Sequence, residues 1–244
     1  MNVIHKQTAF VPHARRREDK TSAVLDAAMA LLAEGGLEGL TLQAVAHRLG
    51  IVTTALYRYF PSKDALLAAL QRRAVSEVHA HLSAELGRVP SVVGRVAPEV
   101  AALAALLHAA RTYMDLPRAR PEAFRLLALL IGDPRVLIAD EEAARTAPLV
   151  TELLVEMARL FALAAEASAL EAGDALGRTL TLWATLHGLT QLEKLRRVAP
   201  HAPTAATLAD ESVAALLRGF GATPNLLSRA RRALDRLPLT GETA

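Results

Sequence analysis

The chain contains no cysteine, and this absence excludes several kinds of chemistry. Disulfide bonds, cysteine-ligated zinc, iron–sulfur clusters and thiol catalysis all require that residue. Common enzyme signatures are missing as well, namely a Gly-rich phosphate loop, Gly-x-Ser-x-Gly and His-Glu-x-x-His. We therefore expect a protein that is not an enzyme, has no catalytic residue and carries no cofactor.

Long apolar runs are missing too. No apolar stretch reaches about 18 residues without a charge, which is the length needed to cross a membrane. The first residues, MNVIHKQTAFVPHARRREDK, lack the apolar core of a signal peptide. Together with the missing cysteines, which fit a reducing compartment, these absences predict a soluble, cytoplasmic protein with no membrane partner.

Aromatic residues are scarce, with one Trp, three Tyr and five Phe among 244 residues. The hydrophobic share is nevertheless 52%, and it comes largely from alanine and leucine with good helix formers between them. Because β-branched and aromatic runs are few, the composition predicts an all-α protein.

A metal site in this chain would have to use histidines and carboxylates. The best candidate cluster is Glu77, His79, His81 and Glu85, of which Glu77, His81 and Glu85 share one helix face. Polar side chains on a single helix face are usually exposed to solvent and bind no metal ion. We therefore expect no metal site.

The net charge of +3 is unevenly distributed. Residues 1–88 carry 11 Lys and Arg against 8 Asp and Glu, whereas residues 89–244 carry 17 of each. The densest basic run is Arg15, Arg16 and Arg17. It could be a phosphate-binding arm or a solvated tail, and charge alone favours neither.

Two short helices near the N-terminus follow a longer one. Apolar periodicity predicts a first helix at about 18–34, stopped by two glycines. Thr41 can cap a second helix that ends before Gly50, and a third helix at about 53–60 is ended by Pro61. Such a pair is typical of a helix-turn-helix, although an ordinary helical hairpin fits the pattern equally well.

Ser62 can cap a longer helix at about 63–86. Beyond it, prolines and glycines separate further helices of one larger bundle. We expect them at about 92–114, 121–131, 134–145, 147–170, 172–197, 204–219 and 225–236.

The helix at about 53–60 has two different faces. At about 100° per residue, Leu56 and Phe60 point inward and Arg58 points the opposite way, beside Thr54. Small side chains and an arginine suit the major groove of DNA, and flanking tyrosine hydroxyls would reach phosphates. The alternative is that the tyrosines are half-buried packing residues whose hydroxyl groups reach solvent.

Lys63 favours the DNA interpretation. A cation in the first turn of a helix opposes the helix dipole, at a cost of roughly 0.3–1 kcal/mol, whereas a phosphate would be attracted by both the charge and the helix end.

Residues 35–70, GGLEGLTLQAVAHRLGIVTTALYRYFPSKDALLAAL, strongly resemble the N-terminal domain of TetR-family transcriptional regulators. The resemblance rests on the Gly-Leu-Thr entry, the Leu-Gly-Ile end of the first short helix, the Leu-Tyr-x-Tyr-Phe recognition helix and the lysine that opens the next helix. It implies base contacts for Val52, Thr53, Thr54 and Arg58. It implies phosphate contacts for Thr41, Tyr57, Tyr59 and Lys63, an occasional base contact for Gln43, and a basic arm containing Arg15, Arg16 and Arg17.

The same resemblance implies the domain plan. It assigns 15–62 to the helix-turn-helix DNA-binding domain and 63–221 to a helical effector-binding and dimerisation domain. Residues 1–14 are expected to form a disordered basic tail, because they show no periodicity. Residues 222–244 lie beyond the last helices of the usual family pattern. We expect them to form an extension helix and a loose tail.

For the larger domain, the resemblance implies an interior effector cavity and a homodimer built through the last major helices. Candidate residues for the cavity wall are His108, Arg111, Tyr113, Met114, Arg125, Trp183 and His187. Candidate residues for the dimer interface are Ala184, Gly188, Leu192, Leu195, Val213, Leu216 and Leu217. The expected effector is small and largely apolar, because the chain is so aliphatic.

These inferences predict a sequence-specific regulator, a repressor released from a palindromic operator by its effector. The alternative classes are a helical enzyme and a helical adaptor without DNA affinity. Neither explains why one short helix carries a basic, polar face opposite an apolar one.

Overall fold

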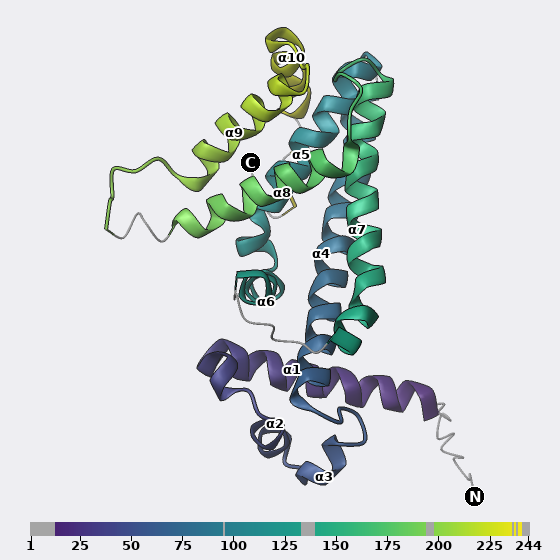
Figure 1. The fold of residues 1–244 in the computed structure, drawn as a ribbon, viewed down its shortest axis with the longest axis vertical. Coiled ribbons are helices and arrows are strands. Elements are labelled where there is room, and N and C mark those ends of the chain that lie inside the picture. The colour runs from purple at the N-terminus through teal and green to yellow at the C-terminus, as the bar shows by residue number, and fades with distance from the viewer. Residues whose placement is uncertain are drawn as a thin grey trace, which may run out of the picture. The chain divides into compact units, whose positions relative to one another are not determined.

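The computed structural model describes residues 13–94, 96–132, 140–193, 198–235, 237, 239 and 240, with only the backbone for 13, 14, 16, 92 and 129–132. These residues contain ten α-helices and no strand, which confirms the all-α prediction (Figure 1). The chain forms two compact units, Met1–Leu70 with Val136–Ala143, and Gln71–Arg135 with Ala144–Ala244.

The first unit contains α1 (His13–Gly39), α2 (Leu42–Leu49), α3 (Thr53–Leu56) and the start of α4 (Lys63–Val93). Helix α1 begins earlier than predicted and continues to Gly39 through a kink at Gly36, whose φ is 64°. That left-handed conformation suits glycine. The predicted tail covers residues 1–14. Of these, residues 1–12 lie outside the described residues.

Both predicted caps of α2 are confirmed. Thr41 Oγ1 accepts a hydrogen bond from the backbone N–H of Ala44 at 3.0 Å. Gly50 lies in the left-handed region, with φ 64° and ψ 30°. Ser62 likewise caps α4, because its hydroxyl accepts from the N–H of Ala65 at 3.0 Å. These caps fix where each helix begins or ends.

The second unit contains the rest of α4, α5 (Pro98–Ala119), α6 (Pro121–Gly132), most of α7 (Asp140–Glu166), α8 (Ala175–Leu192), α9 (Ala205–Gly219) and α10 (Pro224–Leu234). Three predicted boundaries at prolines are wrong, since Pro90, Pro117 and Pro148 each lie inside a helix. Proline removes one backbone donor and does not by itself end a helix whose other residues are packed. The two helices expected around Pro148 are therefore one.

The C-terminal extension is part of the core of the second unit. Helix α10 packs along α5, and α8 and α9 lie side by side (Figure 1). Leu226, Leu227, Ala230 and Leu234 of α10 are all buried in the main apolar cluster. A chain ending near residue 221 would leave the α5 surface beneath them exposed to water.

A buried polar cluster joins α4, α5 and the end of the chain. Glu85 is 2% exposed, and its carboxylate accepts from Arg88 Nη1 at 2.6 Å and from the hydroxyl of Thr240. His108 is fully buried, with Nε2 3.2 Å from Glu85 Oε2. Because a carboxylate only accepts, the proton of neutral His108 belongs on Nε2, which leaves its buried Nδ1 without a partner among the described atoms.

Among the helices described, none is long and apolar enough to span a bilayer.

Candidate nucleic-acid interface and ligand cavity

The turn between α2 and α3 is tight and held by the backbone. The N–H of Ile51 donates to the carbonyl of Ala46 at 3.0 Å, and the N–H of Gly50 donates to that of His47 at 3.1 Å. Helix α3 then spans only Thr53–Leu56, shorter than the predicted 53–60. The chain continues as a turn in which the N–H of Phe60 still donates to the carbonyl of Leu56 at 2.9 Å.

The predicted inward face of this segment is confirmed. Leu56 is fully buried and Phe60 is 5% exposed. On the outward side Val52 is 70% exposed and Tyr57 is 53% exposed. The two apolar anchors therefore present the opposite side of the segment to solvent.

The other predicted base and phosphate contacts lie in the same unit. Thr41, Gln43, Thr54 and Arg58 are exposed, whereas Thr53 and Tyr59 are half-buried. Their positions on or beside α2 and α3 fit a helix-turn-helix surface. Whether they touch DNA stays a prediction.

Lys63 has a structural partner that the sequence did not indicate. Its Nζ donates to the carbonyl oxygen of Leu37, near the end of α1, at 2.7 Å. This bond gives the lysine a role in the absence of a phosphate. The position of Lys63 in the first turn of α4 therefore does not require DNA.

The basic run lies inside α1 and not in an arm ahead of it. The side chains of Arg15 and Arg17 are exposed, and that of Arg16 lies outside the described residues. On a helix Arg15 and Arg17 point about 200° apart. The two side chains therefore leave α1 on nearly opposite sides, and their contact with DNA stays a prediction.

A further contact ties α2 to α1. Arg48 Nη2 lies 2.6 Å and 2.8 Å from the two carboxylate oxygens of Glu34. Both side chains are partly exposed, so the pair adds only a modest stabilisation. The sequence analysis missed it because the two residues belong to different helices.

The second unit contains a partly open apolar cavity of about 310 Å³ between α4, α5, α7 and α8, with Leu127 of α6 also in its wall. Of the predicted pocket residues, Tyr113 and Trp183 lie in its wall. Sequence reasoning missed the contribution of α7, although its apolar spacing could have indicated it. That contribution comprises Val150, Leu153, Leu154, Met157, Leu160 and Phe161.

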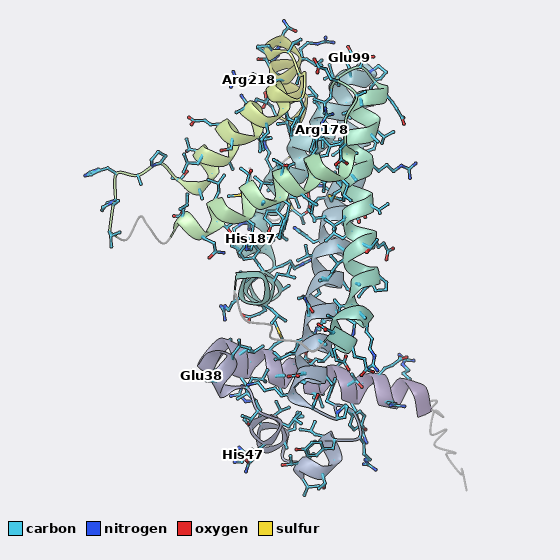
Figure 2. All side chains as sticks on the ribbon, viewed as in Figure 1. Glu38, His47, Glu99, Arg178, His187 and Arg218 are labelled. Atoms are coloured by element: carbon cyan, nitrogen blue, oxygen red, sulfur yellow. The ribbon has the colours of Figure 1, made fainter. Side chains whose placement is uncertain are left out.

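Aromatic side chains close one side of this cavity. The Tyr113 hydroxyl lies 2.9 Å from Nδ1 of His187, which is on α8 (Figure 2). The rings of His187 and Trp183 stack, with their centroids 5.6 Å apart. Burial raises the pKa of Tyr113 strongly and lowers the pKa of His187. Both groups are therefore neutral at pH 7, and the cavity wall carries hydrogen-bonding groups without charge.

The remaining predicted pocket residues lie elsewhere. His108 contacts Glu85 in the buried cluster and is not among the residues that line this cavity. Arg111 and Met114 line a separate depression. Arg125 is exposed, 3.6 Å from Glu122.

The outer face of α8 is an exposed stripe of apolar and small residues. Leu176, Leu180, Ala184, Gly188 and Leu192 recur every four residues along it, and all five are exposed. Such a stripe is suited to close packing against a second helix pair. Ala184, Gly188 and Leu192 thus remain predicted interface residues.

The α9 part of the predicted interface needs correction. Val213 is 3% exposed and Leu217 is 1% exposed, and both belong to the protomer's own core. They are therefore unavailable to a partner subunit. Leu216 is half-buried, and Leu195 lies outside the described residues.

The candidate metal cluster is divided among other contacts. Glu77 pairs with Arg73, His79 contacts Glu156, and Glu85 lies in its buried cluster. Within the described part of the chain, no group of three or more His, Asp or Glu side chains could hold a metal ion.

Both units are similar in sequence to known protein families. Residues 24–70 match the family described as bacterial regulatory proteins, tetR family. Residues 103–218 match the tetracyclin repressor-like C-terminal domain. The fold is that of a solved protein of unknown function from Rhodococcus sp. RHA1, with a TM-score of 0.62, 25% identity, and coverage of 88% of this chain and 99% of that one.

Curated relatives match mainly at the N-terminal end. The HTH-type transcriptional repressor KstR of Mycobacterium tuberculosis is 38% identical over 76 residues, 30% of this chain and 34% of KstR. The HTH-type transcriptional regulator RutR of Escherichia coli K12 is 31% identical over 135 residues, 54% of this chain and 58% of RutR. The chain thus spans about a third of the length of the first relative and under two thirds of the second.

An all-helical chain with a capped helix-turn-helix and a separate cavity-bearing bundle defines a class, the helix-turn-helix transcriptional regulators. Within that class the chain belongs to the TetR family of bacterial regulatory proteins.

Proposed function

We propose that the protein is a sequence-specific DNA-binding repressor that works as a homodimer and is released from its operator by a small, uncharged, largely apolar effector. The observation that carries the proposal is the α3 segment. Leu56 and Phe60 anchor it in the protein, while Val52, Thr54 and Arg58 are offered to solvent. A short helix exposing small residues and an arginine suits the major groove.

The exposed α8 stripe supports the dimer. Two copies related by a two-fold axis would bury Ala184, Gly188 and Leu192 of each protomer. A dimer places two recognition helices in successive major grooves, about 34–36 Å apart, on a palindromic site. Half of the operator is then read by each protomer.

The cavity supports release by an effector. Its wall is almost entirely aliphatic, and its polar groups, on Gln71, Tyr113, Thr179 and Trp183, are neutral. A charged ligand there would lose its hydration without an opposite charge to compensate. The boundary between the two units falls inside α4, which makes this helix the proposed link, so effector and operator affinities should be reciprocally coupled.

Replacing Arg58 with alanine tests the DNA interface. We expect operator binding to weaken by about 1–3 kcal/mol, with relaxed selectivity at one base position and unchanged dimerisation. The measurement is fluorescence anisotropy on an operator obtained by genome-wide selection with the purified protein, repeated over a set of single-base variants.

His47→Ala is a suitable control, because His47 is exposed on α2 outside the predicted contacts. Lys63→Ala is a poorer control, since Lys63 also holds the carbonyl of Leu37. An Arg58 variant that binds the operator like the original protein would remove Arg58 from the reading surface. A selection that enriches no sequence would contradict the proposal as a whole.

Filling the cavity tests the effector site. Ala109 lines the cavity, so Ala109→Leu should reduce binding of the neutral dye N-phenyl-1-naphthylamine by about tenfold while sparing operator binding. Energy transfer from Trp183, the single tryptophan of the chain, reports on the dye directly. The matched control is Ala80→Leu at an exposed position of α4, and equal dye binding by the two variants would place the dye elsewhere.

A further inference from the structure

The C-terminal extension forms part of the wall of a second depression. This depression is separate from the apolar cavity between α4, α5, α7 and α8. It has a volume of about 350 Å³. Its apolar floor combines Leu107 and Met114 of α5 with Val213 of α9 and with Leu237 and Leu239 after α10. Three segments that are distant in sequence thus build one concave site, at the small end of the range found for ligand pockets.

Two arginines stand at the mouth of this depression. Arg111 of α5 and Arg231 of α10 line both the depression and the shallower hollow outside it. Within the described part of the chain, Arg111 makes no hydrogen bond or ion pair, and Arg231 makes one hydrogen bond, to the carbonyl oxygen of Asp210 at 3.1 Å. Most of their ten N–H donors are therefore available to a ligand.

The charges that line the depression itself favour a monoanion. Arg118 donates to both carboxylate oxygens of Asp115, at 2.7 Å and 2.9 Å. Among the described residues of the depression, Asp210 is then the carboxylate without such a pairing, against two guanidinium groups, whereas Glu211 lines only the outer hollow. The remaining excess of one positive charge matches a carboxylate better than a doubly charged phosphate.

We propose that this depression binds a small carboxylic acid with an apolar body. The carboxylate lies between Arg111 and Arg231, whose planar groups hold such an anion with paired hydrogen bonds. The apolar part covers Leu107, Met114 and Leu237. This site is independent of DNA binding and differs in chemistry from the neutral cavity, with which it shares only Ala110.

The probe for this site is octanoate, with 1-octanol as its uncharged counterpart. Isothermal titration on the full-length protein carrying Ala109→Leu, which blocks the other cavity, should show octanoate binding about tenfold more tightly than octanol. Arg111→Gln and Arg231→Gln should each weaken octanoate by about tenfold or more and leave octanol unchanged, because each removes charged hydrogen bonds.

Arg229→Gln is the matched control on the same helix, since Arg229 points to Glu99 and not to the depression. Arg111→Lys should keep part of the affinity. Amide hydrogen exchange gives a second measurement, in which octanoate should slow exchange in α10.

Equal octanoate affinity of the Ala109→Leu protein with and without each glutamine substitution would overturn the proposal, and so would octanoate binding that leaves α10 exchange unchanged. Loss of operator binding in the Arg58 variant has no bearing on it, so the two proposals can fail separately.

Discussion

Replacing Glu85 with alanine should lower the free energy of unfolding by about 3 kcal/mol. The carboxylate accepts hydrogen bonds from Arg88, His108 and Thr240, and the fully buried His108 would be left with no acceptor for its Nε2 proton. Arg88 is partly exposed and can be rehydrated, which keeps the loss below that for a wholly buried ion pair. Urea unfolding followed by circular dichroism, at one fixed protein concentration, measures it.

Glu77→Ala is the matched control on the same helix, because its partner Arg73 is partly exposed and the i,i+4 pair is worth only about 0.3–0.5 kcal/mol. If Glu85→Ala does not fold, Thr240→Val is the second variant. It removes the hydroxyl that contacts Glu85 and Arg88, keeps the hydrogen bond from the backbone N–H of residue 240 to Glu85, and should still destabilise. Equal stability of the Glu85 and Glu77 variants would contradict the assigned role of the cluster.

The pH dependence of stability checks the same cluster. Burial raises the pKa of Glu85, but hydrogen bonds from Thr240 and Arg88 outweigh it and hold that pKa below its ordinary value. Burial lowers the pKa of His108. Both groups bind protons more readily when unfolded, so stability should fall as pH drops below the ordinary histidine value of 6.5, and further below the ordinary carboxyl value of 4.5.

Replacing Ala184 with glutamate should weaken the dimer by about 3–5 kcal/mol, since each copy would bury an unpaired charge at the proposed interface. By two-fold symmetry the substitution occurs twice in every dimer. Sedimentation equilibrium measures the dissociation constant, and operator affinity should fall with it, because a monomer reads only one half-site.

The control for this prediction is Val155→Glu on α7, where the original side chain is 60% exposed and lies outside the α8 stripe. It should leave the dimer intact. An Ala184 variant that remains as dimeric as the Val155 variant would exclude the outer face of α8 as the interface.

Features that depend on neighbouring residues could be predicted from the sequence. The caps at Thr41, Gly50 and Ser62 and the buried pair Leu56 and Phe60 all follow from spacing within a single turn or helix. Local hydrogen bonds and helical periodicity are sufficient to fix them.

Features that depend on distant segments were missed. The Glu85 cluster joins residues 155 positions apart in the chain, and Lys63 meets a carbonyl 26 residues before it. The helix boundaries predicted at Pro90, Pro117 and Pro148 were wrong because packing on several sides outweighs one missing backbone bond. Val213 and Leu217 were assigned to the dimer because periodicity does not tell which neighbour covers an apolar face.

The prolines inside α5 and α7 also bear on the mechanics of the cavity wall. Pro117 offers no N–H to the carbonyl of Tyr113, and Pro148 offers none to that of Ala144, so each helix has a fixed point of low bending stiffness next to cavity-lining residues. If the cavity is the proposed effector site, compliance at these two points should let it accept ligands longer than rigid walls around about 310 Å³ would hold.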